Sequence, residues 1–196
     1  MTLPDGRSWI YADCAVLPDP SPDALADIAV AGAASCRLLL GEEPRVALLS
    51  FSTHASARHP LVDKVAEAAA ILQRREVDFA FDGPLQADAA LVPEIARRKS
   101  AATGADRLGG RANVLIFPNL DAGNIAYKLT ERLAQARALG PLLQGIALPV
   151  HDLSRGCSTE DVVDVITVAA AAAVSARDSG SIRGERGPQE LERSLA

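Results

Sequence analysis

Strand-like and helix-like segments alternate along this chain, and this alternation constrains its fold more than any other sequence feature. Apolar runs of strand length occur at 9–17, 46–51, 77–81, 113–117 and 142–150, of which the first is expected to form one strand or a short strand pair. A longer segment with helical periodicity follows each of them. This order predicts an α/β fold: a mostly parallel sheet with helices on both faces.

Cap and breaker residues set the expected helix boundaries. Ser21 or Asp23 is expected to cap the first helix, Gly41 follows its end, and Pro60 opens the second. The stretch 82–88 is expected to form a tight turn into the third helix. Helices are therefore predicted from Ser21 or Asp23 to about residue 40, over 60–75 and 85–98, from Asp121 or Asn124 to residue 138, and over 158–176.

Composition and charge exclude several classes of protein. Of the 196 residues, 48% are apolar and 23% are charged, which is typical of a globular chain and not of a disordered one. The net charge of −5, the absence of a dense basic run and an aromatic content of 4% argue against nucleic-acid binding. The tail 178–196 is charged and without periodicity, so it is predicted to be disordered.

Targeting and metal-binding patterns are also missing from the sequence. The N-terminus has no apolar signal region, and the longest uncharged apolar stretch, 165–176, is too short to span a bilayer. The 3 cysteines and 3 histidines are widely spaced and form neither a disulfide framework nor a metal-ligand motif. We therefore expect a cytoplasmic protein with no membrane contact and no bound metal.

Polar segments follow the predicted strands at 50–53, 117–121 and 151–158. Ligands of parallel sheets bind in the crevice beyond the carboxyl ends of the strands, so these segments are candidate binding sites. The hydroxyls of Ser52 and Thr53 suit an anion, although an ordinary polar turn with His54 on the surface explains them equally. Neither glycine-rich nucleotide motif, GxxxxGK[ST] or GxGxxG, occurs.

The segment 152–161 (DLSRGCSTED) joins a strand end to a helix start and has the densest chemistry. There Ser154 and Arg155 offer donors to a phosphate or an oxyanion, and Asp161 is a candidate base. The alternative is structural, because Ser158 and Asp161 have capping-box spacing and Arg155 could form an ion pair with a neighbouring acid. We expect Cys157 to be a packed residue.

Five stretches in this order closely resemble the phosphate acetyltransferase (phosphotransacetylase) family over about residues 1–177. They are LLSFST at 48–53, HPLVDKV at 59–65, DGPLQADAALVPEIARRKS at 82–100, ANVLIFPNLDAGNIAYKL at 112–129 and GPLLQGIALPVHDLSRGCSTEDVVD at 140–164. The resemblance implies reversible acetyl transfer between coenzyme A and phosphate, with no bound metal or prosthetic group. It also implies a fold like that of isocitrate and isopropylmalate dehydrogenases, with two α/β domains beside a cleft.

The resemblance also implies roles for single residues. Asp161 is expected to take the thiol proton of coenzyme A, Ser154 to hydrogen-bond in the same site, and Arg155 to hold phosphate. Ser52, Thr53, Asn119 and Asn124 are the candidate residues for binding phosphate or coenzyme A. The family further suggests a homodimer.

The match covers only the C-terminal part of a family member, and about the first half of a complete catalytic unit is missing. Residues 1–148 are expected to form the second domain, 149–177 to return to the otherwise missing first domain with the catalytic motif, and 178–196 to be a tail. Two alternatives to acetyl transfer remain. One is a catalytically incomplete acyl-CoA-binding or regulatory module, and the other is a transferase for propionyl or butyryl groups.

Overall fold

The computed structural model describes residues 1–100, 107–146, 148–153 and 155–178. The chain divides into two compact units, Met1–Pro141 and Leu142–Ala196. The division comes before the domain boundary expected at residue 148. The predicted disordered tail lies almost entirely outside the described residues.

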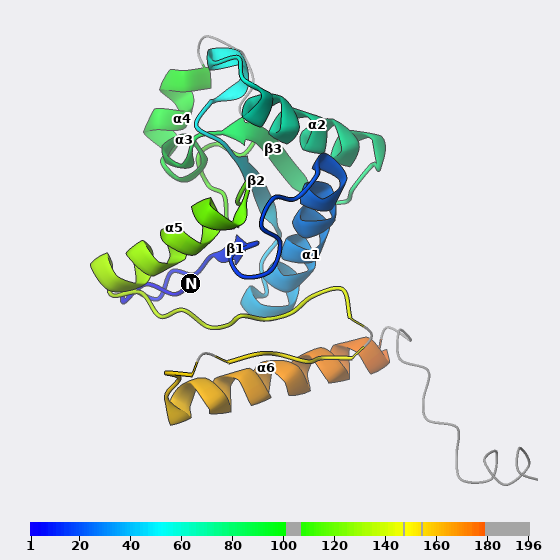
Figure 1. The fold of residues 1–196 in the computed structure, drawn as a ribbon, viewed down its shortest axis with the longest axis vertical. Helices are drawn as coiled ribbons and strands as arrows, with labels where there is room; N and C mark the ends of the chain where they lie inside the picture. Colours follow the sequence, from blue (N-terminus) through cyan, green and yellow to red (C-terminus); the bar gives the residue numbers. More distant parts are fainter. Residues whose placement is uncertain (101–106, 147, 154, 179–196) are drawn as a thin grey trace, which may run out of the picture. The chain divides into compact units, whose positions relative to one another are not determined.

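A four-stranded parallel sheet forms the centre of the first unit (Figure 1). Its strands lie in the order β1-β4-β2-β3, and every neighbouring pair is parallel. The bounds are β1 Ile10–Ala12, β2 Arg45–Leu49, β3 Ala80–Leu85 and β4 Val114–Ile116. This arrangement confirms the predicted α/β class with a mostly parallel sheet.

Helices cover both faces of the sheet, as the alternation predicts. Figure 1 shows α1 and α2 on one side and α3, α4 and α5 on the other. The first unit contains the helices α1 Pro22–Leu40, α2 Pro60–Arg74, α3 Ala87–Leu91, α4 Pro93–Ser100 and α5 Leu120–Leu133, with a 3₁₀ turn at His54–Ser56. Parallel sheets are stable in this two-sided arrangement because both faces are removed from water.

Each face of the sheet has its own apolar core. Val46 and Leu48 of β2 belong to the core under α1 and α2, whereas Ala47 and Leu49 belong to the opposite core. Successive side chains of a strand point to opposite faces, so one short apolar strand supplies both cores. The continuous apolar run at 46–49 is thus explained by burial on both sides.

The first two helices begin and end where their cap residues predict. Ser21 Oγ accepts a hydrogen bond from the Ala24 N–H at the start of α1. At its end Gly41 has φ 65°, in the left-handed region that glycine adopts without a steric penalty, and its N–H donates to Arg37 O. Helix α2 begins at Pro60 and ends at Arg74, within one residue of the prediction.

The prediction for the third strand and the following turn was wrong in its bounds. β3 spans Ala80–Leu85, so Asp82 to Leu85, expected in a turn, lie within the strand. Pro84 has no N–H to donate, and it is tolerated because β3 is an edge strand with a neighbour on one side only. Gly83 passes so close to Leu48 of β2 that a Cβ there would lie 2.7 Å from the Leu48 Cβ.

Three other predicted elements are shorter than expected. Within 9–17 only β1 is a strand, because the backbone N–H groups of residues 15–17 bond to the Asp13 carboxylate instead of a neighbouring strand. The helix expected over 85–98 is divided into α3 and α4, with Val92 in an extended conformation before Pro93. Helix α5 ends at Leu133 and not at residue 138.

The second unit contains helix α6, Thr159–Asp178. Its described residues include no strand, so the fifth strand expected over 142–150 was wrong. Gly145 has φ 78°, which breaks the extended run, and Leu148 and Val150 are more than half exposed. Throughout the described ranges, no helix combines the length and apolarity needed to cross a membrane.

Candidate functional site

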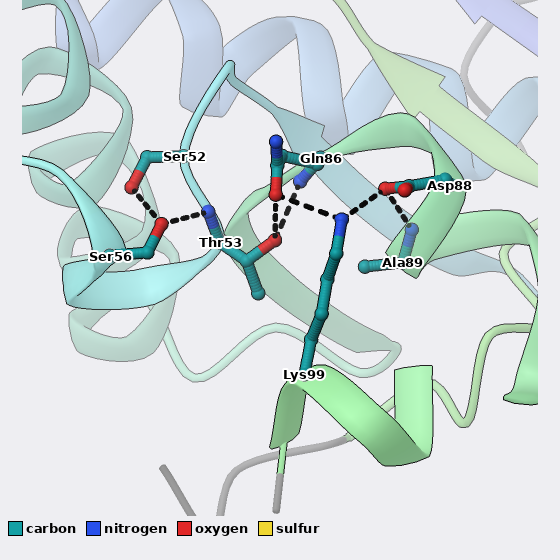
Figure 2. Close-up of polar contacts among 7 residues, drawn as sticks. All are labelled: Ser52, Thr53, Ser56, Gln86, Asp88, Ala89 and Lys99. Carbon is teal, nitrogen blue, oxygen red and sulfur yellow. Dashed lines mark hydrogen bonds and ion pairs between the residues drawn. The ribbon is translucent and has the colours of Figure 1, made fainter. Parts of the chain in front are cut away.

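Hydrogen bonds join the segments that follow β2 and β3 at the carboxyl edge of the sheet. Figure 2 shows these contacts, which connect the loop after β2, the start of α3 and the end of α4. We call the side chains that take part the polar network: Ser52, Thr53, Ser56, Gln86, Asp88 and Lys99. The network lies at the edge of the sheet where α/β proteins bind their ligands.

Ser52 and Thr53, both predicted ligand-binding residues, belong to this network and are buried. Ser52 Oγ accepts from the Ala57 N–H at 3.0 Å, and it lies 3.0 Å from Ser56 Oγ. Ser56 Oγ in turn accepts from the Thr53 N–H at 3.0 Å. The hydroxyl of Ser52 therefore holds the loop after β2 in shape.

Gln86 lies at the centre of the polar network. Its Oε1 accepts from Thr53 Oγ1 at 3.2 Å and from Lys99 Nζ at 2.9 Å, while its own N–H donates to Thr53 Oγ1. Lys99 Nζ also donates to Asp88 Oδ1 at 2.6 Å. Gln86 thus links the loop after β2 to helix α4.

The ion pair between Lys99 and Asp88 perturbs the carboxyl group. The hydrogen bond from Lys99 lowers the pKa of Asp88 below its ordinary value of 3.8, and the Ala89 N–H adds to this effect against partial desolvation. A carboxylate that accepts charged donors is favoured in its ionised form. Asp88 therefore keeps its charge through mildly acidic conditions and anchors Lys99.

A second carboxylate, Asp82, is buried next to the same loop. Its side chain is 8% exposed, and its oxygens accept from the Gly83 and Arg107 N–H groups. His54 Nε2 lies 3.8 Å from Asp82 Oδ2. His54 has φ 49°, in the left-handed region that non-glycine residues seldom adopt. The loop that carries the polar network thus also lies next to the Asp82 carboxylate, through His54.

Asn119 and Asn124, the other two predicted ligand-binding residues, lie at the start of α5. Asn119 Oδ1 accepts from the Ala122 N–H at 2.9 Å and caps the helix. Asn124 Nδ2 donates to the Cys14 carbonyl oxygen at 3.1 Å, which ties α5 to the loop after β1. Both side chains make structural contacts at the carboxyl edge of the sheet, and their role toward a ligand stays a prediction.

The strand order also contains a switch point. From β2 the chain crosses to β3 through α2 on one face, whereas α5 after β4 lies on the opposite face. Adjacent strands whose connections leave in opposite directions mark the switch point at which open α/β sheets bind ligands. Lys64 of α2 bridges this point by donating to Pro118 O at 2.9 Å and to Asp19 Oδ1.

The predicted catalytic turn lies in the second unit. Asp161 is in the first turn of α6, and its Oδ2 accepts from both the N–H and the Oγ of Ser158, each at 2.8 Å. The Asp161 N–H donates back to Ser158 Oγ at 3.1 Å. This confirms the capping box predicted from the spacing. Arg155 is exposed, and Ser154 lies outside the described residues.

Two of the three cysteines, Cys14 and Cys36, have thiols whose pKa is raised by burial. Burial raises the pKa of the Cys14 thiol to about 12, and the neighbouring Asp13 charge adds to this rise, so Cys14 stays protonated at neutral pH. Cys36 is buried in the core under α1 and its pKa is also raised. Among the described side chains, no three His, Cys, Asp or Glu residues gather in a way that could hold a metal ion.

Sequence reasoning did not predict Gln86, Asp88 and Lys99 as parts of one site. Gln86 and Asp88 follow β3 directly, which is a weak signal for them. The sequence gives no signal for Lys99, because its contact with Gln86 depends on the break between α3 and α4. A break at Pro93 turns the second helix toward the first in a way that one continuous helix would not allow.

The sequence and the structure were compared with known proteins. The family model described as phosphate acetyl/butaryl transferase matches residues 1–170. The chain belongs to this family. Phosphate acetyltransferase from Thermoanaerobacterium thermosaccharolyticum is 56% identical over 83% of the chain and 48% of its own length.

Solved structures of phosphotransacetylases agree with the family assignment. A phosphotransacetylase from Streptococcus pyogenes matches with a TM-score of 0.83 and 43% identity, over 89% of this chain and 52% of that one. A phosphotransacetylase from Staphylococcus aureus matches with a TM-score of 0.77 and 46% identity, over 86% of this chain and 51% of that one. The chain spans about half the length of the curated relatives it matches.

Proposed function

We propose that the chain carries out acyl transfer of the phosphate acetyltransferase type. In this reaction acetyl phosphate and coenzyme A form acetyl-CoA and phosphate, reversibly. The observation that carries the proposal is the turn before α6, where Arg155 precedes a capping box that contains Asp161. Family membership over residues 1–170 supports it.

Asp161 is the proposed base. A thiol with a pKa near 8.5 is only a few per cent thiolate at neutral pH, so a carboxylate that takes its proton accelerates attack by about 10²–10⁴-fold. The sulfur then bonds to the acetyl carbon, the bond from that carbon to the phosphate oxygen breaks, and phosphate leaves with the electron pair. The two hydrogen bonds from Ser158 hold the Asp161 carboxylate in position for this transfer.

Arg155 and Ser154 are the proposed anion ligands. A guanidinium group offers two parallel donors that match phosphate oxygens, and a fixed donor also stabilises the charge that develops on the acetyl oxygen. Ser154 adds a hydroxyl next to it in the sequence. The start of a helix is a favourable place for negative charge, because its first N–H groups have no partner within the helix.

The remaining proposals concern binding and assembly. We assign the binding of phosphate or coenzyme A in the first unit to Ser52, Thr53, Asn119 and Asn124, which all lie at the carboxyl edge of the sheet. Coenzyme A acts as a substrate, and no cofactor stays bound between turnovers. The likeness to dehydrogenase folds and the homodimer, which the family resemblance implies, stay predictions. The cytoplasmic location expected from the sequence patterns also stays a prediction.

The test mixes the purified chain with acetyl phosphate and coenzyme A and follows thioester absorbance. Asp161→Asn is expected to lower turnover by about 10²–10⁴-fold. Glu160→Gln is the matched control, because it neutralises an exposed carboxylate in the same helical turn and is expected to keep turnover. Full activity of Asp161→Asn would overturn the assignment of the base.

A second candidate function is a non-catalytic acyl-CoA-binding or regulatory module. The half-length match to the relatives favours it, because the chain aligns with only 48% of the length of a phosphate acetyltransferase that is 56% identical to it. This module predicts that coenzyme A raises the melting temperature without any turnover. Turnover that depends on Asp161 would exclude it.

The acyl group is a further open choice in the family description, which names both acetyl and butaryl transfer. One methylene changes binding in an apolar pocket by only about 1–3 kcal/mol, so propionyl or butyryl phosphate are alternative substrates. Comparing kcat/KM for acetyl, propionyl and butyryl phosphate under identical conditions identifies the preferred group.

A further inference from the structure

We propose that Gln86 is a positioning residue that fixes the loop after β2 for the anionic substrate. The inference rests on the proposed function, since Ser52 and Thr53 of this loop are proposed ligand-binding residues. It adds a residue that neither the sequence patterns nor the family comparisons single out. Gln86 acts through Thr53 and makes no contact with the reacting atoms.

The first argument is that Gln86 contacts Thr53 twice. Thr53 Oγ1 donates to the side-chain Oε1 of Gln86, and the backbone N–H of Gln86 donates to Thr53 Oγ1, both at 3.2 Å. The side chain of Gln86 supplies the first of these bonds and its main chain supplies the second. A hydroxyl that both donates and accepts has one rotamer and one direction for its proton. Thr53 is 5% exposed, so water cannot replace these bonds without opening the loop.

The second argument is that Gln86 Oε1 is held in turn by a charge. Lys99 Nζ lies 2.9 Å from this oxygen and is itself anchored by Asp88 at 2.6 Å. A hydrogen bond to a charged donor is stronger than one between neutral groups. The amide therefore has a fixed orientation, with its oxygen toward both Thr53 and Lys99 (Figure 2).

The third argument compares the Gln86 bond with the other contacts of the loop. The Ser50 N–H donates to Leu85 O at 2.8 Å, and His54 Nε2 lies 3.8 Å from Asp82 Oδ2. Within the loop, the backbone N–H groups at Thr53 and Ala57 bond to the Ser56 and Ser52 hydroxyls, and the Ser56 N–H bonds to Thr53 O. These contacts shape the loop internally. Among the hydrogen bonds described for the Ser52, Thr53 and Ser56 side chains, those to Gln86 are the ones that join the loop to the next strand's end. Loss of the Gln86 side-chain amide should therefore remove one of the two bonds to Thr53 and loosen the loop, while the backbone bond from residue 86 stays and the sheet stays folded.

Three variants distinguish the effect of losing the Gln86 side chain from the effect of losing the ion pair between Lys99 and Asp88. Gln86→Leu removes the acceptor for both Thr53 and Lys99. Gln86→Glu keeps an oxygen acceptor at the same place. Asp88→Asn is the matched control, because it removes the ion pair of Lys99 but leaves Gln86 and Thr53 joined.

Amide hydrogen exchange of Thr53, Ser56 and Ala57 in the full chain is the first readout. Gln86→Leu is expected to raise these exchange rates by about 3–10-fold, the effect of losing one hydrogen bond to the loop. Gln86→Glu is expected to restore them, and Asp88→Asn to leave them near those of the unaltered chain. Unchanged rates in Gln86→Leu, or equal rates in Gln86→Leu and Asp88→Asn, would overturn the proposal.

Steady-state kinetics is the second readout. Gln86→Leu should raise the KM for acetyl phosphate by about 3–10-fold and change kcat by less than about twofold, because the loop binds and does not react. An equal fall in kcat with unchanged KM would overturn the proposal. Failure of the unaltered chain to turn over refutes the proposed function, whereas the exchange rates still decide whether Gln86 positions the loop.

Discussion

At the scale of single residues, two carboxylates at the carboxyl edge of the sheet, Asp82 and Asp88, each have a partner. Asp82 is buried beside His54, and Asp88 is ion-paired with Lys99. Each carboxylate has a nearby cation or backbone donors, so neither stands in the protein as an isolated charge. The pKa of Asp88 is lowered by its hydrogen bond from Lys99.

Asp88 should make part of the stability depend on pH. Its pKa is lowered in the folded chain, so its contribution is present above the ordinary value of 3.8 and is lost as the pH falls through the folded value. Because the side chain is 49% exposed and screened by water, we expect less than about 1 kcal/mol. Urea unfolding between about pH 6 and pH 2.5 measures it. The difference between the unaltered chain and Asp88→Asn should shrink on the acid side, and parallel curves would contradict this.

Arg155 should matter through its shape as well as its charge. Arg155→Gln is expected to lower kcat/KM for acetyl phosphate by about 10²-fold, because a fixed donor to the developing oxyanion is lost. Arg155→Lys keeps the charge but not the planar pair of donors, and it should recover only part of this loss. The same thioester assay measures both variants. Equal rates for Gln and Lys at this position would show that charge contributes nothing.

At the scale of helices and strands, close approach of backbones decides how the elements pack. A Cβ at Gly123 would overlap the carbonyl oxygen of Asp13, so only glycine lets the start of α5 approach the loop after β1. Asn124 then reaches the Cys14 carbonyl from the same helix. The close approach of α5 to the loop after β1 therefore helps to position the candidate residues Asn119 and Asn124.

Gly123→Ala tests that contact. We expect it to lower the free energy of unfolding by about 1–3 kcal/mol, the range found when extra volume is forced into a packed interior. Gly156→Ala is the control, because a Cβ there would meet no atom within 4 Å. Urea unfolding measures both variants. Equal stability of Gly123→Ala and the unaltered chain would mean that the loop moves aside at no cost.

The elements that sequence reasoning predicted best are those with local signals. Caps at Ser21, Gly41 and Pro60 gave two helices nearly to the residue, and the Ser158–Asp161 spacing gave the start of α6. The predicted bounds of β3 were wrong, because a strand tolerates a proline such as Pro84 only when the strand lies at the edge of the sheet. That position is a property of the assembled sheet and has no local trace in the sequence.

The candidate site was predictable only in part, for the same reason. Ser52 and Thr53 follow a strand and are polar, so the sequence indicates them. Gln86 and Lys99 join them through side chains that are 13 and more residues apart, across a helix break. Single-sequence patterns carry no information on which distant side chains meet.

At the scale of the whole molecule, the chain corresponds to about half of its relatives. The described part of α6 has several strongly exposed apolar side chains, namely Val163 at 56%, Ile166 at 62% and Val174 at 59%. Exposed apolar surface of this kind marks a place where other protein surface is usually found. The unmatched half of the relatives is a natural candidate to supply it.

Adding that half in trans tests this idea. The N-terminal half of the Thermoanaerobacterium thermosaccharolyticum relative, expressed separately, is expected to raise thioester formation by the chain until it saturates with concentration. The Ile166→Glu variant, with a charge on the exposed face of α6, should need more of the added half. The half alone is the background control. Turnover that is unchanged by the added half would contradict the expectation.

The strand order also has a consequence for how this protein is made. β4 lies between β1 and β2, yet it is the last of the four strands in the chain. A ribosome therefore releases β1, β2 and β3 before the strand that joins the first of them to the others. Until residue 116 emerges, β1 has no neighbour, and the facing edge of β2 stays open to other nascent chains. Chaperone demand should consequently fall sharply once translation passes β4.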